Sequence, residues 1–158
     1  MQLELVPPER VGPLIIGMDF DAAHQTLIEL PGYRPPPLGR REALGFAHYE
    51  SELSISVHAE RGRVKAVEVF RPEERDVVVY QGLSVFDVTA DQVMETVSAR
   101  HALDIVDDGL FVVAPELLLA FSRTHLPERP DDEDGRYFSS VLLAAPGYYL
   151  GPDGNAIY

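Results

Sequence analysis

The chain has 158 residues, of which 46% are hydrophobic and 25% charged, a balance that is typical of a folded domain and argues against a disordered chain. It contains no cysteine, which excludes disulfides, thiolate nucleophiles and zinc–thiolate sites. Its net charge of -13 argues against nucleic acid as a partner, because a phosphate backbone would be repelled.

The N-terminal segment does not have the pattern of an export signal. Its first residues, MQLELVPPER, are acidic and proline-rich where a signal peptide needs a basic region and an apolar core. No apolar run in the chain is long enough for a transmembrane helix. We therefore expect a cytoplasmic protein without a membrane partner.

The first predicted helix follows a glycine-containing apolar stretch. Apolar residues recur every three or four positions from Phe20 to Leu30, which predicts a helix over residues 20–30. Asp19 directly precedes the pattern and is a suitable N-cap, and the proline and glycine after Leu30 end the helix.

The same stretch contains residue types that are found in ligand sites. Asp19, Asp21 and His24 could bind a divalent cation, but a cap, a first-turn acid that opposes the helix dipole and a residue beside the apolar stripe have simpler structural roles. Gly12 and Gly17 have the glycine spacing of a P-loop, but Met-Asp follows where that loop needs lysine and a hydroxyl residue. We expect neither a metal site nor a phosphate site here.

Three segments after this helix are predicted to be antiparallel strands, namely residues 45–50, 53–60 and 63–70. Residues 31–45 contain too much proline and glycine for regular structure and are predicted to form a surface loop. Its Arg34, Arg40 and Arg41 form a basic patch that could hold an anion or dock against the acidic half of the chain, although a solvated loop is the simpler interpretation.

The second half of the chain has a similar order of elements. Thr89, with Gln92 three residues later, predicts a capping box for a helix that starts at Ala90 and ends near Arg100. Strands are predicted over residues 110–116, 117–123 and 136–145, and the tail over residues 146–158 is predicted to be irregular.

A shift of seventy residues aligns the two halves, since Asp19 falls on Thr89 and both glycine-led apolar stretches and both helical stripes coincide. We therefore predict an α+β fold of two tandem β-α-β-β-β repeats, residues 1–75 and 76–158. Neither repeat can bury its sheet face alone, so the two should share a core and form an antiparallel sheet with the helices packed on one face.

The acidic residues are concentrated in the second half. Residues 76–158 hold 14 of the 26 acidic side chains but 4 of the 13 basic ones. The densest run is Asp131, Asp132, Glu133 and Asp134. An EF-hand needs alternating ligands between two helices, whereas these acids are consecutive and lie between predicted strands. We interpret the run as a solvated hairpin loop, with recognition of a basic partner as the rival interpretation.

The histidines offer one catalytic cluster. None of the five has a metal-ligand spacing to another, and no serine lies in a nucleophile elbow. His48 and His58 fall on adjacent predicted strands and could approach Glu50. Because paired strands always bring some polar residues together, we expect no catalytic residue, no metal and no cofactor.

The opening stretch GPLIIGMDFDAAHQTL, residues 12–27, resembles the Gly-x-Ile-x-Leu-Gly-Met-Thr-x-x-Glu-Val opening of a bacterial group. That group includes the small lipoprotein of the outer-membrane assembly machinery and the tandem-repeat β-lactamase inhibitor protein. The resemblance implies a non-enzymatic protein that binds its target with the exposed face of a sheet built from two repeats. Unlike that group, the chain has no cysteine, and we expect no export signal, so no functional residue is carried over.

These observations predict a non-catalytic protein-binding module, such as an immunity or inhibitor protein, that engages a basic protein through the acidic surface at Asp131, Asp132, Glu133 and Asp134. The alternative is a small-molecule or anion-binding protein, or a small enzyme, with a pocket near His48, Glu50 and His58. A homodimer joined through an exposed strand or sheet face is a third hypothesis.

Overall fold

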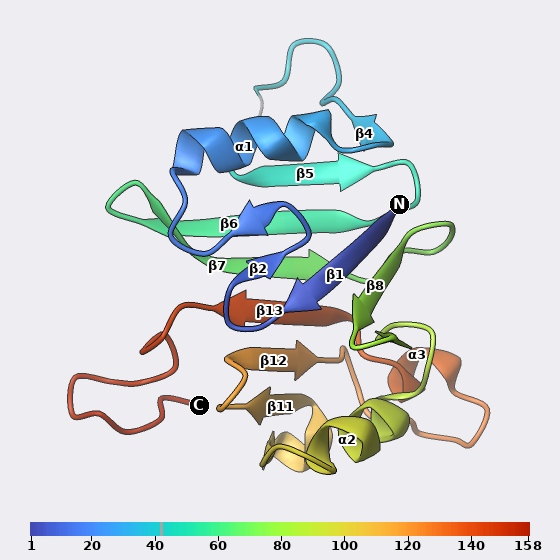
Figure 1. Ribbon diagram of the computed structural model, residues 1–158. Helices are drawn as coiled ribbons and strands as arrows, with labels where there is room; N and C mark the ends of the chain where they lie inside the picture. Colours follow the sequence, from blue (N-terminus) through green and yellow to red (C-terminus); the bar gives the residue numbers. More distant parts are fainter. Residues whose placement is uncertain (42) are drawn as a thin grey trace.

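A computed structural model describes residues 1–41 and 43–158, and its largest feature is an eight-stranded antiparallel sheet (Figure 1). The strand order is β10-β11-β12-β13-β7-β6-β5-β4. The bounds are β4 Tyr33–Arg34, β5 Phe46–Tyr49, β6 Ser54–Glu60, β7 Arg63–Phe70, β10 Asp104–Val106, β11 Phe111–Ala114, β12 Leu119–Ser122 and β13 Ser140–Ala144. The strands from the first half of the chain thus form one side of the sheet and those from the second half form the other.

The two sides meet where β7 pairs with β13. The pairing is antiparallel and runs from Phe70 opposite Ser140 to Ala66 opposite Ala144. Hydrogen bonding is therefore continuous across the sheet from one half of the chain to the other.

A second sheet of five strands corrects the prediction of a single sheet. Its order is β3-β2-β1-β8-β9, with β1 Gln2–Val6, β2 Arg10–Val11, β3 Leu14–Ile15, β8 Val77–Tyr80 and β9 Leu83–Ser84. β1 and β8 pair in parallel, with Leu3 opposite Val78, and the remaining pairs are antiparallel. The sequence does contain a pattern typical of a strand at β1, because apolar Leu3 and Leu5 alternate with polar Gln2 and Glu4. In the structure the two leucines are buried and the two polar residues are exposed.

Both predicted helix caps are confirmed. α1 (Phe20–Glu29) begins at Asp19, whose carboxylate accepts a hydrogen bond from the Ala22 amide at 3.2 Å. α2 (Ala90–Ser98) begins at Thr89, which forms the predicted capping box with Gln92. No helix in the described ranges is both long enough and apolar enough to cross a membrane.

One hydrophobic core joins the helices, the small sheet and the inner face of the large sheet. α1 contributes Ala23 and Leu27, α2 contributes Val93 and Val97, and β1 lies between them over the sheet (Figure 1). Both helices therefore pack on the same face of the large sheet.

The opposite face of the large sheet is covered over its second half by the C-terminal tail. This tail is irregular over residues 146–158, as predicted, and Tyr149 packs there against a smaller cluster that includes Ala120 and Ala144. Tyr148 and Tyr158 form edge-to-face ring contacts with Tyr149, which extends the cover.

Six predicted strands are present as β5, β6, β7, β11, β12 and β13. β10 is not predicted, and β4 lies within residues 31–45, which are predicted to be a loop and whose position 42 lies outside the described residues. The acidic run is not wholly a hairpin loop, because residues 133–136 form the short helix α3 (Glu133–Arg136), which is capped by Asp132. A four-residue helix is too short to leave a helical pattern in the sequence.

Candidate functional site

The four acidic residues predicted to bind a partner lie on the connection between β12 and β13, residues 123–139, on the same side of the molecule as α2 (Figure 1). Asp132 has an internal role in this connection. Its carboxylate accepts hydrogen bonds from the backbone amides of Glu128 at 3.1 Å and Gly135 at 3.2 Å, and it lies 3.1 Å from His125 Nε2. These contacts, the Glu128 amide above all, lower the pKa of Asp132. Asp132 therefore stabilises the folded conformation of the segment that also contains Asp131, Glu133 and Asp134.

The three neighbouring acids have a different environment. Asp131, Glu133 and Asp134 are exposed. Within residues 76–158, all of which the structure describes, the only carboxylates within 4.0 Å of a basic group are those of residues 76, 116 and 132, which lie beside the N-terminal amino group, His101 and His125 respectively. The carboxylates of Asp131, Glu133 and Asp134 are thus exposed to solvent and form no ion pair within residues 76–158.

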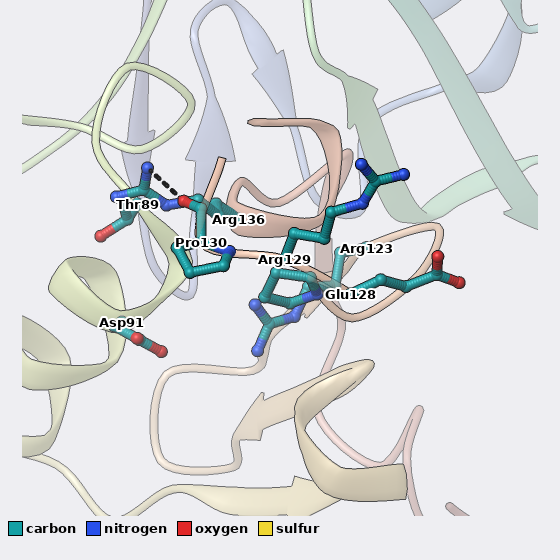
Figure 2. A pocket seen from close by; sticks show the side chains of 8 residues that line it. Thr89, Asp91, Arg123, Glu128, Arg129, Pro130 and Arg136 are labelled. Carbon is teal, nitrogen blue, oxygen red and sulfur yellow. Dashed lines mark hydrogen bonds between the residues drawn. The ribbon is translucent and has the colours of Figure 1, made fainter. Parts of the chain in front are cut away.

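A hollow of about 510 Å³ lies between the start of α2 and the β12–β13 connection (Figure 2). We call it the arginine hollow, and its lining residues are Thr89, Asp91, Arg123, Pro127, Glu128, Arg129, Pro130 and Arg136. The acidic run at residues 131–134 does not line it. The connection therefore exposes carboxylates to solvent in one part and presents arginines to the hollow in another.

Arg123 is fixed in place by the backbone around it. Its Nε donates to the Gly109 carbonyl at 2.8 Å, one terminal nitrogen donates to the Gly135 carbonyl at 3.2 Å, and the guanidinium lies 5.7 Å from the centre of the Phe138 ring. Gly109 has a φ of +103°, and a Cβ at this position would lie 2.8 Å from Arg123. A glycine is therefore required at position 109 both for the turn and for the close approach of this arginine.

The other two arginines are held less tightly. Arg136 donates to the Pro130 carbonyl at 3.4 Å, a contact visible in Figure 2. The Arg129 carbonyl accepts the Asp132 amide at 3.1 Å, but the Arg129 guanidinium forms no hydrogen bond or ion pair within the described part of the chain. Sequence reasoning missed this group. A signal was present, because Arg123, Arg129 and Arg136 are three of only four basic residues in residues 76–158.

The predicted cluster of His48, Glu50 and His58 is not brought together. His48 contacts Ser54 Oγ through Nδ1 at 2.7 Å and Glu52 through Nε2 at 2.9 Å. Glu50 instead faces Arg75 at 3.9 Å, and the exposed His58 lies opposite Ala66 on β7. The hydrogen bond from His48 is the main reason why the pKa of Glu52 is lowered.

Ser54, His48 and Glu52 have the hydrogen-bonding order of a nucleophile, a base and an orienting carboxylate. Acyl transfer also needs donors aimed at the developing oxyanion. Ser54 lies on β6 between β5 and β7, where backbone amides point along the plane of the sheet and pair with the neighbouring strands. We interpret this group as a cross-strand network that ties β5 to β6.

The remaining sequence candidates have these positions. Arg34, Arg40 and Arg41 line a smaller hollow of about 250 Å³ beside His48. His24 Nδ1 accepts the backbone amide of residue 45 at 3.1 Å. Over residues 1–41 and 43–158, no group of three or more His, Cys, Asp and Glu residues is arranged to hold a metal ion.

No family model matches the chain, and no curated protein matches it. Among solved structures, the chain is similar to a cysteine-rich secretory protein from Staphylococcus aureus, with 14% sequence identity and a TM-score of 0.40. The match covers 91% of this chain and 50% of that protein, so the chain spans half the length of the structure it matches.

Proposed function

We propose that this protein is a non-catalytic binding protein that engages a basic protein, as an immunity or inhibitor protein does, through the acidic surface formed by Asp131, Glu133 and Asp134. One observation carries the proposal. These carboxylates are exposed and unpaired, although Arg129 and Arg136 belong to the same connection. Unpaired carboxylates in the more acidic half of the chain create a negative potential that attracts a basic partner and speeds its association.

The packing of the connection supports the same proposal. Asp132 caps α3 and joins it to the Glu128 amide, and Gly135 is buried so closely that a Cβ there would lie 2.7 Å from the Pro127 nitrogen. A surface that is already folded loses less conformational entropy on binding than a flexible loop.

We also infer that the chain is a duplicated unit with copies at residues 1–75 and 76–158. The strand order of the large sheet supports this, because it follows β7-β6-β5-β4 outward from the β7–β13 pair on one side and β13-β12-β11-β10 on the other. Each set of strands follows a capped helix in the sequence.

The β6–β7 connection is two residues, Arg61 and Gly62, whereas the corresponding β12–β13 connection spans residues 123–139. The acidic segment is therefore an insertion into one copy, and such connections commonly carry function on a fixed framework.

We propose that the protein acts in the cytoplasm, since a chain without cysteine needs no oxidising compartment to form disulfides. The resemblance of residues 12–27 to the tandem-repeat inhibitor group agrees with a binding role, although in that group the sheet face makes the contact. We place the contact on the β12–β13 connection because the C-terminal tail covers the second half of the outer sheet face.

The experiment compares two variants with equal loss of charge. Proteins captured from a lysate of the source cell on the immobilised chain are identified, and the association rate of the purified captured protein is measured at low and high salt. The triple variant Asp131→Asn, Glu133→Gln, Asp134→Asn should associate at least about tenfold more slowly than the unmodified chain at low salt, and the difference should shrink as salt rises.

The matched control removes three exposed carboxylates from the first half, as Glu9→Gln, Asp21→Asn and Glu73→Gln. It should keep most of the association rate, because its changes lie outside the β12–β13 connection. An unchanged rate in the first triple variant, or equal slowing in the control, would remove this acidic surface from the interface.

A further inference from the structure

The arginine hollow gathers most of the positive charge of the second half of the chain. Of the four basic residues in residues 76–158, only Arg100 lies outside it. Although this half carries 14 carboxylates, none lies within 4.0 Å of any of its arginines, all of which the structure describes. Asp91 and Glu128 also line the hollow, so its three arginines outnumber its two carboxylates, and none of the three is paired with either of them. Unpaired guanidinium groups that share a hollow repel one another, and an anion bound between them removes that cost.

The arginines keep unused donors that such an anion can take. A guanidinium has five N–H groups. Arg123 uses its Nε and one terminal nitrogen on backbone carbonyls, and Arg136 uses one terminal nitrogen. Arg123 is therefore held in place by two contacts and Arg136 by one longer contact, each with donors left over, and the Arg129 guanidinium is available to bind a ligand. Fixed guanidinium donors are well matched to the paired oxygens of a phosphate group.

The size of the hollow and its other lining residues limit the size and the chemical class of the part of the ligand that carries the anionic group. A volume of about 510 Å³ suits a small molecule. None of the described side chains that line the hollow is aromatic, so it offers a nucleobase no ring on which to stack. Asp91 and Glu128 lie on opposite sides of the hollow (Figure 2), where they repel an extended polyanion and can accept hydrogen bonds from hydroxyl groups.

From these contacts we propose that the arginine hollow binds a small phosphate monoester with a hydroxylated, non-aromatic body, such as a glycerol or sugar phosphate. Arg129 and Arg136 hold the phosphate together with Arg123, while Thr89 and the two carboxylates face the body of the ligand. The start of α2 supplies no free amide for this purpose at Gln92, because that amide donates to Thr89 Oγ at 3.3 Å. Since the residues of the acidic surface do not line the hollow, the proposal stands apart from the proposed function.

The experiment titrates glycerol phosphate into the protein at constant ionic strength and follows binding by calorimetry and by the phosphorus NMR signal. Saturable binding is expected, with inorganic phosphate as a competitor and no binding of glycerol alone. The double variant Arg129→Gln, Arg136→Gln should bind at least about tenfold more weakly, because it loses charge-assisted hydrogen bonds to the ligand.

Arg100→Gln is the matched control, since it removes a positive charge of the same half away from the hollow, and it should bind as the unmodified chain does. Arg123 is left unchanged because it also supports the connection, and thermal unfolding verifies that every variant is folded. The proposal is overturned if glycerol phosphate gives no saturable binding at millimolar concentration, or if Arg100→Gln weakens binding as much as the double variant.

Discussion

At the scale of single residues, Asp132 links a local hydrogen-bond network to the stability of the β12–β13 connection. Its carboxylate accepts the amides of Glu128 and Gly135 only when the connection is folded. The ionised form accepts these bonds best, so its pKa lies below the ordinary value of 3.8 in the folded protein. A carboxyl group of this kind stabilises the fold above its unfolded pKa, and this stabilisation is lost as the pH falls through the folded pKa.

The lowered pKa of Asp132 predicts how Asp132→Asn changes the pH dependence of stability. The unmodified chain should lose stability to urea as the pH falls from about 4 toward 2. In the variant, which cannot ionise at this position, the decline should be shallower and the stability at pH 7 lower. Asp131→Asn is the control, because its carboxylate accepts no hydrogen bond among the described residues, and it should follow the unmodified chain. Parallel pH profiles for Asp132→Asn and the unmodified chain would contradict the capping role.

At the scale of elements, the caps explain where the two main helices begin. Thr89 Oγ accepts the Gln92 amide at 3.3 Å, and the Gln92 side chain accepts the Thr89 amide at 2.9 Å. Thr89→Ala removes the first contact and should lower the free energy of unfolding by about 1 kcal/mol, measured by urea unfolding followed by circular dichroism. Thr89→Ser keeps the hydroxyl and should restore most of the loss, and equal losses in the two variants would mean that the cap contributes little.

The elements that could be predicted from the sequence are those with local signals. The Asp19 and Thr89 caps, the two helical stripes and the alternation in β6 each lie within one short segment, and each is present in the structure. The parallel pairing of β1 with β8 joins segments that are far apart in the sequence, so no local sequence pattern predicts it.

The same reasoning applies to the candidate site. The acidic run at residues 131–134 is visible as composition, but the separate role of Asp132 depends on amides that its own fold brings within reach. The arginine hollow depends on α2 and the β12–β13 connection lying side by side, which is a property of tertiary structure. Likewise, His48 lies opposite Ser54 because of the β5–β6 register, which places its Nδ1 near that hydroxyl.

At the scale of the whole molecule, both sheets contain strands from both halves of the chain. β1 of the first half pairs with β8 of the second, and β7 pairs with β13. The buried Ser51 hydroxyl also donates to Asp76 at 2.5 Å across the boundary at residues 75 and 76. Unfolding either half alone would therefore expose the shared core and break both sheets, which is the condition for a single cooperative transition.

Leu27→Ala tests this cooperativity, because it removes a fully buried side chain of α1 and should cost about 2–5 kcal/mol. With fluorotyrosine incorporated, NMR signals of Tyr49 report on the first half and those of Tyr149 on the second. In the unmodified chain, the Tyr49 and Tyr149 signals should report unfolding with the same urea midpoint. In the variant, the urea midpoints reported by both signals should fall by the same amount. If the Tyr149 midpoint stays where it was while that of Tyr49 falls, the halves unfold independently, and the β7–β13 pairing does not couple them.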